Sequence, residues 1–198
     1  MRVILIRHGE TEHNAKDSIT GQLDVSLNKY GVEQAEKAAN RLEKYSFDAA
    51  YSSDLERTYE TTKIIAERHG LEPQRYKEFR ERGFGEYEGK PKDDWRKVVR
   101  EHDGDRHFLK PDGGESLREV GQRFVGKLDE LREKHGEDET ILVGGHSVAL
   151  KATMMEILNL SGEGYNKLSQ DNTGLTEIKH SEKRGWKLVR MNDTAHLE

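Results

Sequence analysis

The sequence predicts an α/β fold: a three-layer α/β/α sandwich around a mostly parallel central sheet that includes an antiparallel strand. Short apolar runs rich in β-branched residues alternate along the chain with longer segments whose apolar residues recur at helical spacing. A run such as Val3–Ile6, apolar at every position, is typical of a parallel strand buried on both faces. We expect one domain over residues 1–198, because no linker or internal repeat interrupts the chain.

The expected elements are strands at about 3–6, 47–51, 75–79, 140–143, 175–179 and 187–189 and helices at about 28–45, 53–69, 94–101, 116–131 and 148–160. Two of the helices open with a capping-box pattern, in which a serine is followed three places later by a glutamate. These pairs are Ser53 with Glu56 and Ser116 with Glu119. The last two strands flank a turn near Gly185 and are expected at the edge of the sheet.

Composition and charge exclude several classes of protein. The net charge is only -5 and the signs are interspersed, so no basic stripe marks a nucleic-acid partner. The chain has no cysteine, which excludes a disulfide framework and a thiolate metal site. No run is long enough to span a membrane, and the chain enters its first strand without a charged leader. We therefore expect a cytoplasmic enzyme.

Polar residues follow three of the expected strands at the point where each strand ends. Arg7 and His8 follow the first strand, Ser52 to Arg57 follow the second, and His146 follows the fourth. Ligands of open α/β sheets bind outside these carboxyl ends, so the three segments should converge on one site. The guanidinium fork matches phosphate oxygens, and a histidine beside two arginines can act as nucleophile or base. The pattern predicts a site for a phosphate-like oxyanion.

The segment Arg7-His8-Gly9-Glu10-Thr11 resembles the signature of the histidine phosphatase superfamily, in its phosphoglycerate mutase-like branch. The other matching positions are Asn14, Gly21-Gln22, Asp24, Leu27, Gly31, Gln34-Ala35, Ser52 to Thr58, Glu81, Phe84 to Gly89, Gly114 to Ser116, His146 and Asn192 to Leu197. These matches occur in order over nearly the whole chain, which makes the resemblance much more specific than any one short motif.

The resemblance implies a role for each site residue. His8 would be phosphorylated on a ring nitrogen, and Glu81 would protonate the leaving oxygen and later take a proton from the attacking water. The residues that would bind the phosphoryl group are Arg7, Asn14, Gly21, Gln22, Arg57 and His146. Two arginines and a protonated His146 can neutralise that group, so no metal ion and no cofactor is expected. The expected partner is a small phosphorylated metabolite.

Two positions depart from the family pattern. His13 stands where an aromatic residue is common, and Ser147 follows His146 where glycine is usual. Trp95 and Tyr87 suit either the core or a pocket wall, and both interpretations stay open. Oligomeric state is not predicted.

Histidines elsewhere in the chain favour structural interpretations. The run from His102 to His107 matches no standard zinc or calcium spacing and is expected to be an exposed loop. His69 and His135 precede glycines at helix ends, where a cation suits the helix dipole.

The superfamily contains both phosphatases and mutases, which share the phosphohistidine step. Mutase relatives carry a longer insertion between the acid-bearing loop and the second histidine, and the segment from Glu81 to His146 is too short to hold it. The sequence therefore favours a phosphatase acting on small phosphomonoesters. A phosphoglycerate mutase-type isomerase is the alternative. A non-catalytic phospho-ligand-binding module would show damage to the catalytic set, and the sequence shows none.

Overall fold

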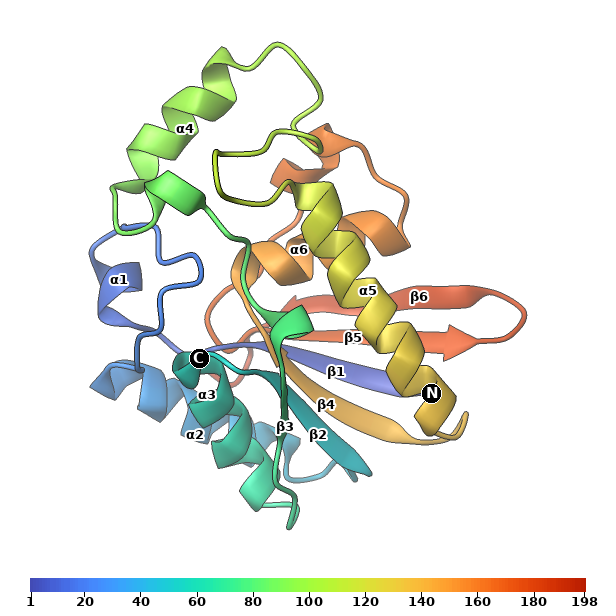
Figure 1. The fold of residues 1–198 in the computed structure, drawn as a ribbon. Coiled ribbons are helices and arrows are strands. Elements are labelled where there is room, and N and C mark those ends of the chain that lie inside the picture. Colours follow the sequence, from blue (N-terminus) through green and yellow to red (C-terminus); the bar gives the residue numbers. More distant parts are fainter.

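The computed structural model describes residues 1–198 and has a six-stranded sheet in the order β3-β2-β4-β1-β5-β6 (Figure 1). The strands are β1 (Arg2–Arg7), β2 (Ala49–Ser53), β3 (Gln74–Tyr76), β4 (Thr140–Gly145), β5 (Leu175–Ser181) and β6 (Gly185–Asp193). Strands β1 to β4 are parallel to their neighbours in that group, and β5 runs antiparallel to both β1 and β6. The predicted mixed, mostly parallel sheet is confirmed.

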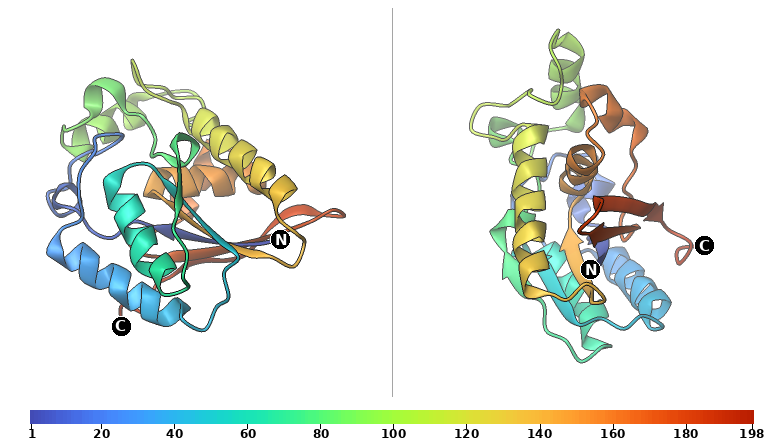
Figure 2. Two further views of the ribbon diagram at one scale, coloured as in Figure 1. Left: turned by 60° about the horizontal axis from the view of Figure 1, so that its bottom comes forward. Right: turned by 90° about the vertical axis from the view of Figure 1, so that its right-hand side faces the viewer.

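Two pairs of helices cover the two faces of this sheet. The helices are α1 (Glu12–Ala15), α2 (Lys29–Leu42), α3 (Glu56–Glu67), α4 (Lys92–Glu101), α5 (Leu117–Lys134) and α6 (Ser147–Ile157), with short 3₁₀ turns η1 (Lys77–Phe79), η2 (Gly85–Tyr87) and η3 (Gly162–Lys167). Helices α2 and α3 pack together on one face of the sheet and α5 and α6 on the other; the left view of Figure 2 shows α2 below the strands and α5 above them. The predicted three layers are therefore present.

Strand β1 shows why the run Val3–Ile6 is apolar at every position. Val3 and Leu5 belong to the core cluster that holds the apolar residues of α5 and α6. Ile4 and Ile6 point the other way and belong to the cluster with α2 and α3. A strand alternates its side chains between faces, so a strand covered on both faces has no position left for a polar residue. Because β1 lies between β4 and β5, the position of Arg7 and His8 at its carboxyl end is fixed by strands on both sides.

The structure differs from the sequence-based expectations at three elements. The predicted capping box at Ser53 is wrong: α3 begins after Leu55, and the Ser53 hydroxyl accepts a bond from the Leu55 amide at 3.3 Å instead. The strand predicted at 75–79 is shorter: β3 ends at Tyr76, and the chain then forms the 3₁₀ turn η1. Helix α1 was not predicted, and Thr11 and Asn14 form its capping box.

Helix α4 lies apart from the sheet, next to the loop that carries α1 (Figure 1). A small cluster of Ile19, Phe84 and Trp95 packs beneath it, separate from the two main clusters. No helix in the fold combines the length and the apolar character that crossing a membrane requires.

Candidate active site

The parallel strands bring residues from distant parts of the chain to one edge of the sheet. Arg7 pairs with Gly145 in the β1–β4 register, and the His8 amide donates to the Gly145 carbonyl at 3.1 Å. The rings of His8 and His146 therefore meet edge to face, with their centroids 5.2 Å apart. Arg57, in the first turn of α3, reaches the same point. The convergence expected from the strand ends is present.

A cavity of about 370 Å³ lies at this point. Six of the predicted site residues line it: Arg7, His8, Asn14, Gly21, Arg57 and Glu81. His146 and Gln22 do not line the cavity but contact residues that do. The cavity opens between the carboxyl edge of the sheet and α4, whose Lys92, Trp95 and Arg96 form part of its wall.

His8 is held in a single tautomer by the backbone. Its Nδ1 lies 2.7 Å from the Gly9 carbonyl oxygen, which can only accept a hydrogen bond, so Nδ1 carries the proton. The lone pair is then on Nε2. Burial, followed by the positive charges of Arg57 and Arg7, holds the pKa of His8 well below 6.5. Nε2 is therefore an unprotonated nucleophile at neutral pH.

The two arginines are anchored by backbone carbonyl groups. Arg7 Nη1 donates to the Gln170 carbonyl, and Arg57 donates through Nη1 to Leu23 and through Nη2 to Gly21, each at 2.8 Å. The Nε atoms of both arginines are buried and have no acceptor in the protein. Burial lowers the pKa of Arg57 to about 10, so its guanidinium stays charged at neutral pH. Two fixed cations with unused donors suit an anion that carries several acceptor oxygens.

His146 is fully buried between Arg57 and Thr58. Arg57 Nη2 can only donate, so His146 Nδ1 accepts at 3.2 Å, and Nε2 donates to the Thr58 hydroxyl at 3.1 Å. Burial and the charge of Arg57 hold the pKa of His146 well below its usual range. In the free site a neutral His146 is therefore favoured, because a second cation next to Arg57 in a buried pocket is disfavoured. The expectation of a protonated His146 concerns the site with a phosphoryl group bound and stays a prediction.

The Glu81 carboxylate lies at the amino terminus of α6. Oε1 accepts from the backbone amides of Arg82 and Ala149 at 2.9 and 2.8 Å, and Oε2 accepts from Val148 at 3.1 Å. The first turn of α6 thus fixes the position of this carboxylate directly after β4. Oε2 accepts only this one hydrogen bond and therefore keeps a lone pair available to a ligand.

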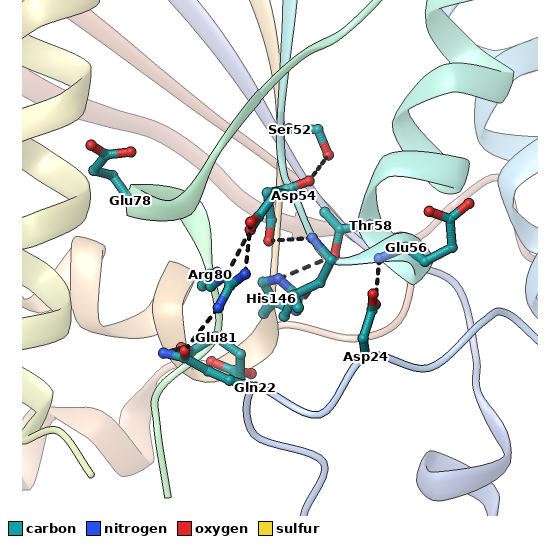
Figure 3. A network of polar contacts seen from close by, with 12 residues as sticks. Gln22, Asp24, Ser52, Asp54, Glu56, Thr58, Glu78, Arg80, Glu81 and His146 are labelled. Carbon is teal, nitrogen blue, oxygen red and sulfur yellow. Dashed lines mark hydrogen bonds and ion pairs between the residues drawn. The ribbon is translucent and has the colours of Figure 1, made fainter. Parts of the chain in front are cut away.

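Asn14 and Gln22 occupy different places around the cavity. Asn14 Oδ1 accepts from Thr11 at 3.1 Å, which leaves the two Nδ2 donors of Asn14 available to a ligand. The Gln22 amide instead donates to the Glu81 carbonyl at 3.1 Å and to Glu115, so it supports the loop that carries Glu81. Arg80 lies between Gln22 and Asp54 in the same network (Figure 3).

A family model of the histidine phosphatase superfamily (branch 1) matches residues 3–194. The chain belongs to the histidine phosphatase superfamily. The resemblance found in the sequence is confirmed, and the matched residues include every site residue described above.

Individual members of the superfamily align with this chain over its whole length. The probable phosphoglycerate mutase GpmB of Yersinia pestis is 34% identical, and the alignment covers 100% of this chain and 95% of the relative. YhfR of Bacillus stearothermophilus has a TM-score of 0.90 at 27% identity and covers 100% of this chain and 99% of that one.

Two similar solved structures are phosphatases. A mycobacterial glucosyl-3-phosphoglycerate phosphatase in complex with VO3 has a TM-score of 0.86 at 29% identity and covers 96% of this chain and 98% of that chain. Phosphoserine phosphatase from Entamoeba histolytica, in complex with 3-phosphoglyceric acid, has a TM-score of 0.85 at 27% identity and covers 100% and 99%.

The two positions that depart from the superfamily pattern each make a side-chain hydrogen bond within the protein. Ser147 is the first residue of α6, and its hydroxyl donates to the Gln170 carbonyl at 3.2 Å, the same carbonyl that anchors Arg7. His13 hydrogen-bonds Ser18 at 2.9 Å and does not line the cavity. Both interpretations left open for Trp95 apply, because it is buried like a core residue and also forms part of the cavity wall.

Several cavity residues were not predicted as site residues from the sequence. They are Ser18, Ile19, Thr20, Arg82, Phe84, Lys92, Arg96, Arg106, Ser147, Val148 and Tyr165. Arg106 lies in the run from His102 to His107, which is largely exposed as expected. The charged residues of this region form no helical or strand pattern that would point one of them toward a site, so only the tertiary structure reveals Arg106.

Proposed function

We propose that the protein is a cofactor-independent phosphatase that hydrolyses small phosphomonoesters through a phosphohistidine on His8. The observation that supports this most strongly is the fixed tautomer of His8, which lines the same cavity as the half-buried Arg7 and the buried Arg57. A nucleophile that needs no deprotonation is ready to attack, and the guanidinium groups neutralise the equatorial oxygens of the transferred group.

In the first step, His8 Nε2 bonds to phosphorus and the bond to the ester oxygen breaks. Glu81 acts as the general acid and donates a proton to the leaving oxygen, so the alcohol departs neutral. In the second step, water attacks phosphorus, loses a proton to the Glu81 carboxylate, and the phosphorus–nitrogen bond breaks. Inorganic phosphate leaves, and both residues return to their starting states.

The remaining predicted residues have binding or supporting roles in this proposal. Arg7 and Arg57 bind the phosphoryl oxygens through their guanidinium groups, and the Asn14 side-chain amide donates neutral hydrogen bonds to the same group. His146 keeps Arg57 in place in the free site, and a phosphoryl dianion close to His146 would favour its protonated form. Gly21 contributes a carbonyl that anchors Arg57, and Gln22 acts through the Glu81 loop rather than on the ligand.

The phosphoenzyme is the decisive test. Wild-type protein mixed with a ³²P-labelled phosphomonoester and quenched in base should retain label that is stable to alkali and lost in acid. His8→Asn should retain none, and His13→Asn, a histidine outside the cavity, should label like wild type. Label that persists in His8→Asn would contradict the proposal, and no label in any variant would favour a non-catalytic module.

A mutase remains the second candidate, because the relative of Yersinia pestis that is 34% identical is named a probable phosphoglycerate mutase. 3-Phosphoglycerate, supplied with and without 2,3-bisphosphoglycerate as primer, distinguishes the two. A phosphatase releases inorganic phosphate in both cases, whereas a mutase forms 2-phosphoglycerate and depends on the primer. The expected product is inorganic phosphate. A cytoplasmic location stays a prediction.

A further inference from the structure

Helix α5 places one arginine against the backbone of the loop that carries Glu81. Arg123 Nη1 donates to the carbonyl oxygens of Glu78 and Arg80, at 2.6 and 3.1 Å. Its Nη2 donates to the carbonyl oxygen of Glu81 itself at 3.4 Å. One side chain therefore fixes the backbone at Glu81 and on the amino-terminal side of it.

Glu115 holds both this arginine and the other side of the loop. Its carboxylate forms a bidentate ion pair with Arg123, in which Oε1 accepts from Nε at 2.9 Å and Oε2 from Nη2 at 3.0 Å. Oε2 also accepts from the Gly83 amide at 2.8 Å, and the Glu115 amide donates to the Gly83 carbonyl at 2.9 Å. A bidentate pair fixes direction as well as distance. We call Glu115 and Arg123 the anchor pair.

The loop depends on these side chains because it has no regular structure of its own. Residues 80–84 lie between η1 and η2, outside any helix or strand, so side chains must bind their backbone groups. The Glu81 carboxylate accepts hydrogen bonds from backbone amides alone, and no side chain of the protein donates to it. The backbone of Glu81 therefore determines where its carboxylate lies, and the anchor pair fixes that backbone.

The anchor pair lies close to the site but does not touch the space for a ligand. Neither Glu115 nor Arg123 lines the cavity. The positive charge of Arg123 still contributes to the lowered pKa of His146, after burial and the charges of Arg57 and His8. Any effect of the pair on the reaction therefore passes through the Glu81 loop or through its charge, and not through contact with the substrate.

We propose that Glu115 and Arg123 are positioning residues for the general acid, because they hold the Glu81 backbone where its carboxylate reaches the leaving oxygen. The inference rests on the proposed function, in which Glu81 donates that proton. It gives a role to Glu115, which lies in the matched segment Gly114 to Ser116, and to Arg123, which no sequence motif singled out. Misplacing a reacting group by about 1 Å can cost about 10²-fold in rate.

The leaving group distinguishes a positioning role from a structural one. Arg123→Met should lower kcat/KM for glycerol 3-phosphate, whose leaving oxygen needs a proton, by about 10- to 100-fold. For p-nitrophenyl phosphate, whose leaving group needs no proton, the loss should be less than about threefold. Arg118→Met removes an exposed arginine of the same helix and should leave both values as in wild type. Equal losses for the two substrates in Arg123→Met would overturn the proposal.

Conservative variants decide the question if Arg123→Met does not fold. Arg123→Lys keeps the charge without the bidentate fork, and Glu115→Gln keeps an acceptor for the Gly83 amide without the charge. Both should lose more activity toward glycerol 3-phosphate than toward p-nitrophenyl phosphate. In a Glu81→Gln background, Arg123→Lys should cost less than about a further twofold, because the acid is already absent. Wild-type activity toward both substrates in these two variants, or full additivity in the double variant, would contradict the proposal.

Hydrogen exchange separates failure of the positioning from failure of the phosphatase. The Val148 and Ala149 amides lie in the first turn of α6 and donate to the Glu81 carboxylate, so their exchange, followed by NMR, reports its position without turnover. In Arg123→Lys they should exchange about five- to tenfold faster, the factor that loss of one hydrogen bond corresponds to. Faster exchange in a protein that hydrolyses no phosphomonoester would support the positioning and contradict the phosphatase. Wild-type exchange would overturn the positioning and leave the phosphatase proposal as it stands.

Discussion

At the scale of single residues, the chemistry of the site depends on which atom carries a proton. The Gly9 carbonyl fixes the proton of His8 on Nδ1, and the lowered pKa of the ring keeps Nε2 free at neutral pH. In the same way, Arg57 can only donate, and this fixes the acceptor nitrogen of His146. Backbone and guanidinium groups, rather than a carboxylate partner, therefore set the tautomers of both histidines.

Glu81 gives a prediction at this scale. Glu81→Gln removes the proton that the leaving oxygen needs, so kcat/KM for an alkyl phosphate such as glycerol 3-phosphate should fall by about 10²–10⁴. Activity toward p-nitrophenyl phosphate, whose leaving group needs no proton, should fall by less than about tenfold. Glu86→Gln, an exposed residue outside the cavity, is the control. Equal losses for both substrates would show that Glu81 is not the acid.

At the scale of elements, helix termini position most of the site. The amino terminus of α6 holds Glu81, and the first turn of α3 carries Arg57. The amino terminus of α2 packs directly on the loop after His8, because Gly9 and Gly31 leave room for the two backbones to approach. A Cβ on Gly31 would lie 2.1 Å from the Glu10 carbonyl oxygen.

Gly31→Ala should therefore destabilise the protein by about 1–3 kcal/mol and also lower kcat, since the clash pushes on the loop that carries His8. Urea unfolding and steady-state kinetics measure the two effects. Gly126→Ala, at an exposed helical position of α5 where an added Cβ meets nothing within 4 Å, should instead stabilise by about 0.5–1 kcal/mol. A stability gain in Gly31→Ala would contradict the packing argument.

The capping box at the start of α5 gives a second prediction for an element. Ser116 accepts a hydrogen bond from the Glu119 amide at 3.2 Å, and the Glu119 carboxylate accepts one from the Ser116 amide at 2.8 Å. Ser116→Ala should cost about 1 kcal/mol of unfolding free energy, measured by urea denaturation. Ser46→Ala, at an exposed serine outside any helix, should change stability much less. Equal effects of the two substitutions would count against the cap.

At the scale of the whole molecule, the buried histidines couple stability to pH. Unfolded histidine has a pKa near 6.5, whereas the pKa values of His8 and His146 are well below it in the folded protein. Below pH 6.5 the unfolded chain therefore binds more protons than the folded one, and acid favours unfolding. The free energy of unfolding should fall by up to about 1.4 kcal/mol per pH unit for each of these histidines as the pH drops from 6.5 toward 5.

Urea denaturation at several pH values measures this slope. The double variant with His8→Asn and His146→Asn should show a slope smaller by up to about 2.7 kcal/mol per pH unit, whatever its stability at pH 7.5. His102→Asn, an exposed histidine outside the cavity, should keep the wild-type slope. An unchanged slope in the double variant would mean that the two histidines titrate alike in the folded and unfolded states.

The sequence alone predicted the mixed sheet, its central strand and the polar residues that gather at the strand ends. Val3–Ile6 and the segment 140–143 predicted parallel strands, and Arg7 with His8 predicted an oxyanion site, because periodicity and local motifs carry this information directly. The capping pattern at Ser116 was confirmed, whereas the same pattern at Ser53 was wrong. Whether a serine caps a helix depends on where the backbone turns, and at Ser53 the strand continues to that residue.

Only the tertiary structure placed Arg57 against His146 and formed the charged wall of the cavity. The charge of Arg57 acts on His146 across a buried contact between residues far apart in the chain, and burial itself is not written in a local pattern. Arg106 and Tyr165 meet on that wall for the same reason: they come from segments whose own sequences show no common motif. Periodicity reports which face of an element is covered, but electrostatics depends on distances in space, which the packed fold alone provides.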